Sequence, residues 1–331
     1  MTSSTNPASV AFVIPVVHPE GAKVDDYRVV EAILRETVTS LLAQQRVRPH
    51  VVVVCHRRPS WSVDLPEVRF LLLDHPAFAA NRNVVQVDKG LKYAIGIAYA
   101  LAAWDPALVM PMDDDDFVRR DASAHVLRSL REGDGTEDAG LLTRGYHVVL
   151  RPGRDGRGFD VRAVFEVRQF HTTCGSCRMF HGDRLRALLF DALPELVGFG
   201  ATDIADAEGV VRRDFLDAFL AVAEPLAPDH DGILNILGRH VEQERLELLP
   251  LDALPLVAKG CGHGNHDGPR AGEVHWHQIR SVRRTRRFLE RFGLSGRATL
   301  RARPDPRAAF AGWRAAIKNR IRPVLRATLR R

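Results

Sequence analysis

Long hydrophobic runs are missing from this chain of 331 residues. The longest uncharged stretch that is mainly apolar, Tyr93–Trp104, has 12 residues, which is too short for a helix that crosses a bilayer. The first ten residues, MTSSTNPASV, contain neither a basic nor an apolar segment, so the pattern of a secretory signal peptide is missing too. We therefore expect neither a membrane-spanning nor a secreted protein.

Cysteine is scarce, with only Cys55, Cys174, Cys177 and Cys261. Four cysteines in a chain of this length indicate a reducing cytoplasm rather than a disulfide framework. No zinc-finger, helix-turn-helix or RNP pattern occurs, so nucleic acid is not an expected partner. A composition of 45% hydrophobic and 27% charged residues is typical of a soluble globular protein with a sizeable core.

Positive charge is concentrated at one end of the chain. Residues 280–331 include 17 Lys or Arg and two acidic residues, a net +15, whereas the preceding 279 residues carry −9. Apolar residues are interleaved with the basic ones, as in FAGWRAAIKNRIRPVLRATLRR. This pattern fits an amphipathic helical tail on an anionic membrane surface, such as the inner face of the plasma membrane. A tail that serves only solubility is the alternative.

Strand and helix patterns alternate over roughly the first 115 residues. The spacing of apolar residues predicts helices at 27–45 and 91–104. Short β-branched or apolar runs predict buried parallel strands, which we expect at 11–17, 51–55, 70–73 and 107–112. This order of elements predicts a doubly wound α/β sheet. Ligands of such sheets bind beyond the carboxyl ends of the strands.

After Asp121 the pattern loosens. A glycine- and charge-rich loop is expected at 151–160. Further strands are expected at 161–169 and 178–181, and further helices at 214–222 and 231–240.

Four adjacent carboxylates, Asp113–Asp116, directly follow a hydrophobic strand in LVMPMDDDDFVRRD. Like charges in a row repel one another and resist burial, so we expect a divalent cation to stabilise the cluster. Hard cations such as Mg²⁺ prefer carboxylate oxygens and often bind together with substrate phosphates. The alternative is a solvated acidic loop in which Asp116 or Asp121 caps a helix.

The strand followed by Asp-x-Asp-Asp resembles the matching segment of GT-A glycosyltransferases, in particular the inverting family-2-like enzymes. VAFVIPVV is similar to the first strand of that family, and residues 87–102, VDKGLKYAIGIAYALA, are similar to the helix before its Asp motif. The resemblance implies a Rossmann-like, mostly parallel sheet flanked by helices, with an acceptor-side subdomain. It also implies a nucleotide-diphosphate sugar as donor, a glycan or lipid-linked acceptor of cell-surface polysaccharide synthesis, and Mn²⁺ or Mg²⁺ as cofactor.

By this match, Asp113 and Asp115 are the motif carboxylates, and Asp115 is the expected direct metal ligand. Asp113 and Asp114 are expected to contact the nucleotide-sugar as well. A register shifted by one residue, with Asp114 or Asp116 as ligand, stays open. The residue types themselves suit either register, because each carboxylate offers the hard oxygen ligands that these cations prefer.

The resemblance also assigns residues around the nucleotide. Pro15 ends the strand whose carboxyl end cups the nucleoside, and Lys89 and Lys92 match the basic residue near the diphosphate. The chain departs from the family after the second strand, where CHRRPS (55–60) replaces an acidic, serine-containing turn that contacts the base. Asp74, after the third strand, is the substitute that we expect for that contact.

Two downstream segments match further parts of the family site. In APDHDGILNILGRHVE, Asp229 and Asp231 match the acidic pair that supplies the general base, although plain helix capping explains them as well. In KGCGHGNHDG, His263 or His266 resembles a downstream histidine that completes the metal site in several GT-A enzymes. The alternative is that both histidines are unliganded.

A fourth motif, HTTCGSCRMFH, spans residues 171–181. Its two histidines and two cysteines are potential ligands of structural zinc. The alternative is a strand that lines the acceptor pocket, in which small residues leave room for the acceptor; these are Thr172, Gly175 and Ser176.

We expect a single GT-A domain with two halves. Residues 1–10 are expected to be a disordered N-terminus, 11–120 the nucleotide-sugar-binding half, 121–279 the acceptor-binding half and 280–331 the basic tail. One rival is a metal-dependent nucleotidyltransferase, whose glycine-rich basic loop after the first strand is poorly matched by VVHPEGAKVDD. The other is a non-catalytic membrane-associated scaffold with a degenerate fold, against which the intact aspartates count.

Overall fold

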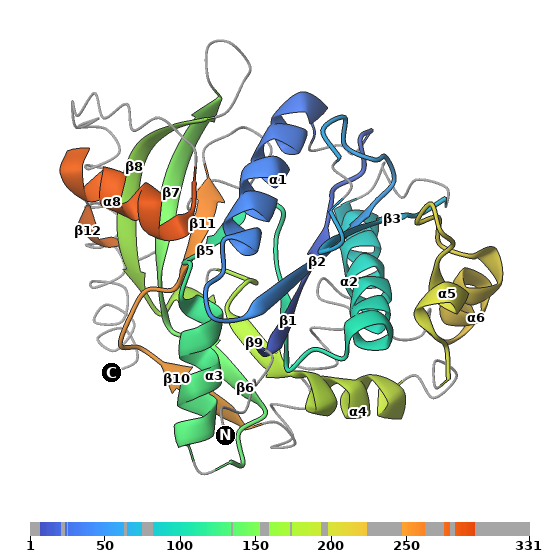
Figure 1. Ribbon diagram of the computed structural model, residues 1–331. Coiled ribbons are helices and arrows are strands. Elements are labelled where there is room, and N and C mark those ends of the chain that lie inside the picture. Colours follow the sequence, from blue (N-terminus) through green and yellow to red (C-terminus); the bar gives the residue numbers. More distant parts are fainter. Residues whose placement is uncertain are drawn as a thin grey trace, which may run out of the picture.

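The computed structural model describes residues 7–20, 24, 26–62, 65–74, 82–133, 135–152, 159–172, 174–192, 198–223, 247–261, 275–278 and 282–294. Over these residues a seven-stranded sheet forms the centre of the molecule, and a five-stranded sheet lies beside it (Figure 1). The predicted α/β class, with a mostly parallel sheet flanked by helices, is confirmed.

The order of strands in the central sheet reverses direction between β1 and β4. The order is β10-β6-β9-β4-β1-β2-β3, and the strands are β1 (Ser9–Pro15), β2 (Arg48–Cys55), β3 (Val68–Leu72), β4 (Leu108–Pro111), β6 (Ala139–Leu142), β9 (Arg178–His181) and β10 (Leu248–Leu251). Only β9 runs antiparallel to its neighbours, β4 and β6. The chain proceeds from β1 to β2 and β3 on one side and then returns to β4 on the other. Ligands bind at such a switch point, beyond the carboxyl ends of the strands.

Helices cover both faces of the central sheet, because alternate residues of its strands are apolar on both sides. One face, with Val10, Phe12 and Ile14 of β1, packs against α1 (Tyr27–Leu42) and α3 (Ala122–Glu132). The other face packs against a second group of helices, namely α2 (Arg82–Trp104), α4 (Gly182–Ala192), α5 (Ala201–Ile204) and α6 (Arg213–Ala223). Figure 1 shows α1 and α2 on opposite sides of β1 and β2.

Helix α2 lies unusually close to the sheet at Gly96. A Cβ atom at this position would lie 2.4 Å from Cγ1 of Val13 and 3.0 Å from Cγ2 of Val54. Glycine therefore allows the helix backbone to approach β1 and β2 directly. This contact fixes the helix that carries Asp88, Lys89, Lys92 and Tyr93.

The second sheet has the order β12-β8-β7-β11-β5. Its strands are β5 (Asp116–Val118), β7 (Arg144–Pro152), β8 (Phe159–Arg168), β11 (Val257–Cys261) and β12 (His275–Gln278). Helix α8 (Val282–Phe292) packs across this sheet (Figure 1) through Phe288, Leu289 and Phe292. The first part of the basic C-terminal segment is therefore part of the folded structure. A short 3₁₀ turn, Phe170–Thr172, follows β8.

Several element boundaries differ from the sequence predictions. Helix α2 begins at Arg82 rather than at residue 91, since the charged pair Asp88 and Lys92 is buried inside the fold. The ends of the predicted loop 151–160 belong to β7 and β8. The predicted helix 231–240 lies outside the described residues. Among the helices described, none has the length and apolar character needed to span a membrane.

Candidate metal and nucleotide site

The Asp cluster occupies a tight turn between β4 of the central sheet and β5 of the second sheet. The amide of Asp116 donates to the carbonyl of Asp113 at 3.3 Å, which closes a four-residue turn with Asp114 and Asp115 at its corners. Thr37 Oγ1 of α1 donates to the carbonyl of Asp114 at 2.9 Å. The amide of Gly260 donates to the carbonyl of Asp115 at 3.0 Å. Both sheets and α1 therefore hold the turn in place.

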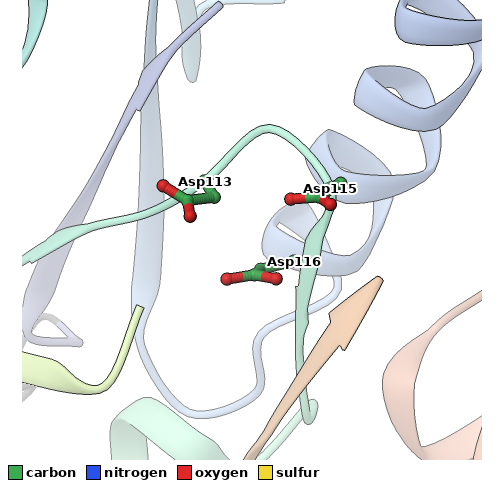
Figure 2. Close-up of side chains that lie close together, drawn as sticks. All are labelled: Asp113, Asp115 and Asp116. Atoms are coloured by element: carbon green, nitrogen blue, oxygen red, sulfur yellow. The ribbon is translucent and has the colours of Figure 1, made fainter. Parts of the chain in front are cut away.

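Three of the four carboxylates converge within this turn. One ligand oxygen from each of Asp113, Asp115 and Asp116 lies within 4.8 Å of the others, and Figure 2 shows the three side chains close together around the turn. In the part of the chain that the structure describes, no other group of three His, Cys, Asp or Glu residues has this property. The structure thus selects Asp116, and not Asp114, as the third member of the cluster.

Asp116 is fully buried and incompletely hydrogen-bonded. Its Oδ2 accepts a hydrogen bond from the Cys174 thiol at 3.1 Å, whereas its Oδ1 has no hydrogen-bond partner among the described residues. Burial, together with the charges of Asp115 and Asp113, raises the pKa of Asp116 well above its ordinary value. A buried carboxylate oxygen without a partner costs free energy unless it meets a cation or a proton.

Helix α2 supplies a cation and a hydroxyl to the same cluster. Lys89 Nζ lies 2.6 Å from Asp113 Oδ1, and Tyr93 donates its hydroxyl hydrogen to that oxygen at 2.9 Å. Burial alone would lower the pKa of Lys89, but the carboxylates, Asp113 foremost, outweigh burial and raise it. Lys89 is therefore a firmly charged ammonium at the edge of the cluster.

The turn before β9 lies against the Asp cluster because β9 pairs with β4. Leu108 faces His181 in the antiparallel register, which brings residue 176 opposite residue 113. The Asp113 amide indeed donates to Ser176 Oγ at 2.8 Å. From the sequence, the motif at 171–181 was interpreted as zinc ligands or as the lining of the acceptor pocket. The contacts of Cys174 and Ser176 with the Asp cluster were therefore missed. Only the pairing of β9 with β4, which has no local sequence signal, reveals them.

A second charged network lies at the carboxyl ends of β1, β2 and β3. Lys92 is fully buried; its ammonium pairs with Asp88 and donates to the carbonyl of Val16 at 2.8 Å. The ring of His56 bridges Asp88 Oδ1 and the carbonyl of Leu73, at 2.9 Å each. Lys92 is thus enclosed by the fold, with its amine paired to Asp88. We therefore revise its predicted direct contact with the diphosphate.

Asp88 is the anion of this network. His56 and Lys92 outweigh the effect of burial and lower the pKa of Asp88, whereas burial lowers the pKa of Lys92. His56 belongs to the segment CHRRPS (55–60), where the chain departs from the family pattern. The network around it was not predicted from the sequence.

The ring of His18, after β1, packs edge-on against that of His56, with centroids 4.5 Å apart. Its Nδ1 accepts a hydrogen bond from the Glu20 amide at 3.0 Å, so Nε2 carries the hydrogen. Burial, with the charges of His56 and Lys92, lowers the pKa of His18. His18 is therefore a neutral ring with one hydrogen-bond donor at the carboxyl end of β1.

The remaining predicted site residues are dispersed. Pro15 is buried at the end of β1, and Asp74 is exposed after β3, so both lie at the carboxyl edge of the sheet as expected. The four downstream candidates fall outside the described residues; these are Asp229, Asp231, His263 and His266.

The residues present suit a hard divalent cation. All cluster ligands are carboxylate oxygens, which Mn²⁺ and Mg²⁺ accept, and one of them is a buried oxygen that lacks a partner. With every group ionised, the three carboxylates and Lys89 sum to −2, the charge that one divalent cation neutralises.

No family model matches the sequence, and neither does any curated protein. The chain is similar to the crystal structure of S. aureus TarS residues 1–349, with 13% identity and a TM-score of 0.36, over 76% of this chain and 60% of that one. It is similar to the 2-C-methyl-D-erythritol 4-phosphate cytidylyltransferase IspD of Francisella tularensis, with 12% identity and a TM-score of 0.36. The match covers 75% of this chain and 90% of that one.

A third similar structure is the 4-diphosphocytidyl-2C-methyl-D-erythritol synthase of Anaerococcus prevotii, with 12% identity and a TM-score of 0.29, over 74% and 87%. Likenesses of this strength carry no argument about activity. The function of this chain is therefore argued from its own site.

Proposed function

We propose that the chain is a GT-A glycosyltransferase that transfers a sugar from a nucleotide-diphosphate donor to an acceptor hydroxyl. The observation that carries the proposal is the turn at the end of β4, where three carboxylates converge around a buried oxygen without a partner. The turn lies at the point where the strand order reverses, which is where α/β sheets bind ligands.

In this proposal, Asp113, Asp115 and Asp116 hold a divalent cation, with Cys174 orienting Asp116. When bound, that cation neutralises the diphosphate, so that the nucleotide becomes a good leaving group. Lys89 donates to the phosphates from the helix side.

The nucleoside is expected at the carboxyl ends of β1 to β3. Pro15 forms the floor there, and the ring of His18 and the carboxylate of Asp74 provide a hydrogen-bond donor and an acceptor for the base. Asp229 or Asp231 is the proposed general base on the acceptor hydroxyl, and His263 or His266 the proposed additional metal ligand. Inversion and an acceptor of the glycan or lipid-linked type follow from the resemblance to the family-2-like enzymes.

Donor hydrolysis tests this proposal without knowledge of the acceptor. The purified chain is incubated with UDP-, GDP-, CMP- or dTDP-sugars and Mn²⁺, and free nucleotide is measured. One donor class should be hydrolysed slowly by wild type, and not by Asp115→Asn or in EDTA. Asp206→Asn, a change at a carboxylate that accepts a hydrogen bond from the Val210 amide and has no role in the proposed site, should behave as wild type.

The same assay separates the rival nucleotidyltransferase. That enzyme would release pyrophosphate from a nucleoside triphosphate in the presence of a phosphorylated acceptor and leave every sugar donor intact. Such a result would replace the glycosyltransferase proposal while retaining the metal site.

A further inference from the structure

Helix α8 has a strongly basic solvent face. Its apolar side packs on the second sheet through Phe288, Leu289 and Phe292. Its opposite side exposes four arginines, Arg284, Arg286, Arg287 and Arg291. Spacings of three and four residues place Arg284, Arg287 and Arg291 on a single stripe along the helix.

This arginine stripe leads into a shallow groove of about 420 Å³. The groove lies between α8, the end of β5 and the loop before β11, and among its lining residues are Arg119, Arg120, Asp121, Leu254, Glu290 and Arg291. Arg291 belongs to both features, so the stripe and the groove form one continuous surface. The three arginines and two carboxylates of the groove give it a charge of +1.

The arginines of the groove differ in how they are neutralised. Arg119 donates from Nε and Nη2 to both oxygens of Asp121, at 2.5 and 2.8 Å. Arg120 and Arg291 make no side-chain hydrogen bond or ion pair with any residue that the structure describes. Two guanidinium groups without a counterion beside a concave surface suit a phosphate, whose oxygens match their paired donors.

An apolar side chain accompanies these charges. Leu254, in the groove, is 39% exposed and is one of two large hydrophobic residues exposed in the described part of the chain. No lining residue of the groove is aromatic, whereas surfaces that bind single-stranded nucleic acid use aromatic stacking. Basic residues around an exposed leucine are instead the pattern of surfaces that sit in the headgroup region of a bilayer.

We propose that the arginine stripe and the groove form a docking surface for an anionic phospholipid membrane. Lipid phosphates bind Arg120 and Arg291, Arg284 and Arg287 face the anionic surface, and Leu254 enters between the headgroups. This surface is separate from the Asp cluster, so its test does not depend on the proposed reaction.

Vesicle sedimentation of the full chain tests the surface. Vesicles of phosphatidylcholine alone are compared with vesicles that contain about one third phosphatidylglycerol, at an ionic strength of about 0.1 M. Wild type should bind only the anionic vesicles. Each arginine near such a surface contributes roughly fivefold to binding, so Arg120→Gln with Arg291→Gln should weaken binding about 25-fold, as should Arg284→Gln with Arg287→Gln. Leu254→Ser should weaken binding to the same vesicles with no change in charge.

The matched control is Arg28→Gln with Arg213→Gln, which removes the same charge from two exposed arginines that already pair with Asp26 and Asp217. This control should bind as wild type does. Equal losses in the control and the two test variants would overturn the proposal, as would equal binding to neutral vesicles. If the test variants lost affinity for an RNA oligonucleotide but kept their affinity for vesicles, the surface would belong to nucleic acid, which also overturns it.

Discussion

Cys174 is the residue through which the structure changes the interpretation of the site most. Its thiol is buried and donates to Asp116, and burial with the charge of Asp116 raises its pKa well above the ordinary value. The thiol therefore remains protonated and acts as a fixed donor, not as a nucleophile or a metal ligand. Its role is to orient the carboxylate that it contacts.

Replacement of this donor should weaken metal binding. We expect Cys174→Ala to reduce Mn²⁺ affinity by about 10- to 100-fold, as loss of an outer hydrogen-bond partner typically does. The measurement is calorimetric titration with Mn²⁺. Cys261→Ala, which removes another buried thiol that donates to a backbone carbonyl, should leave the affinity unchanged; equal effects of both changes would reduce Cys174 to a packing residue.

Asp88 is the buried partner of both Lys92 and His56. Asp88→Asn leaves the Lys92 amine buried without its anion, so the free energy of unfolding should fall by about 3–5 kcal/mol. Asp217→Asn, at an exposed ion pair, should change it by only a few tenths of a kcal/mol. Urea denaturation of both variants checks the difference, and similar losses would contradict the assigned network.

The lowered pKa of Asp88 predicts a pH dependence of the stability of the fold. The folded-state pKa of Asp88 is lowered, so its contribution is fully present above the unfolded value of about 3.9 and disappears as the pH falls through the folded value. The stability difference between wild type and Asp88→Asn should therefore shrink below about pH 4. A difference that persists undiminished at lower pH would mean that Asp88 is not ionised in the fold.

At the residue scale, the sequence pointed to side chains of the Asp cluster that lie within one segment. It missed the contacts that segments distant in the sequence make with that cluster. The Asp cluster was noticed because it follows a hydrophobic strand, and Asp113, Asp115 and Lys89 were chosen from the family resemblance. Cys174 meets Asp116 only through the pairing of β9 with β4. Lys92 was predicted to lie near the diphosphate, because nothing local shows that Asp88 and Val16 enclose it.

At the scale of elements, the contact between β11 and the Asp turn sets the geometry of the site. The Gly260 amide donates to the carbonyl of Asp115, and a Cβ atom on Gly260 would lie 2.3 Å from that oxygen. A backbone oxygen that is held by a hydrogen bond has little room to move. The close approach of strand and turn therefore requires glycine at this position.

Gly260→Ala should displace the turn and lower Mn²⁺ affinity by more than tenfold, because small misplacements of ligands are costly. Gly175→Ala is the comparison, since a Cβ there would lie 3.9 Å from Asp113 Oδ2, an ordinary contact, and should have little effect. The same titration measures both. Normal affinity in Gly260→Ala would show that the turn tolerates displacement.

Strands that are buried on both faces were the elements best predicted from the sequence. The runs of β1 and β2 are continuous and β-branched, so their existence and type followed directly. Strands β5, β6, β10 and β11 have three to five residues each and were missed, because such short strands have no periodicity of their own. Their pairing partners come from distant parts of the chain, since β10 pairs with β6 and β11 pairs with β5 and β7.

At the scale of the whole molecule, the two sheets meet at the Asp turn, and the charges are distributed between separate surfaces. Carboxylates gather where β4 leaves the central sheet for β5, whereas exposed arginines gather on α8. The asymmetry of charge along the chain predicted this separation. The second sheet, which supports both the turn and α8, was not predicted, since it assembles from segments far apart in the sequence.

The central claim is that the Asp turn binds a divalent cation together with a nucleotide. The most direct measurement is the melting temperature of the purified chain with UDP, GDP, CMP or dTDP, each with Mn²⁺ or with EDTA. A ligand that binds only the folded state raises this temperature by mass action. At a ligand concentration of 100 times Kd, the free energy of unfolding increases by about 2.7 kcal/mol. We predict a rise with one nucleotide that is lost in EDTA and in Asp116→Asn. Failure of every nucleotide to shift the melting temperature with Mn²⁺ would contradict the claim.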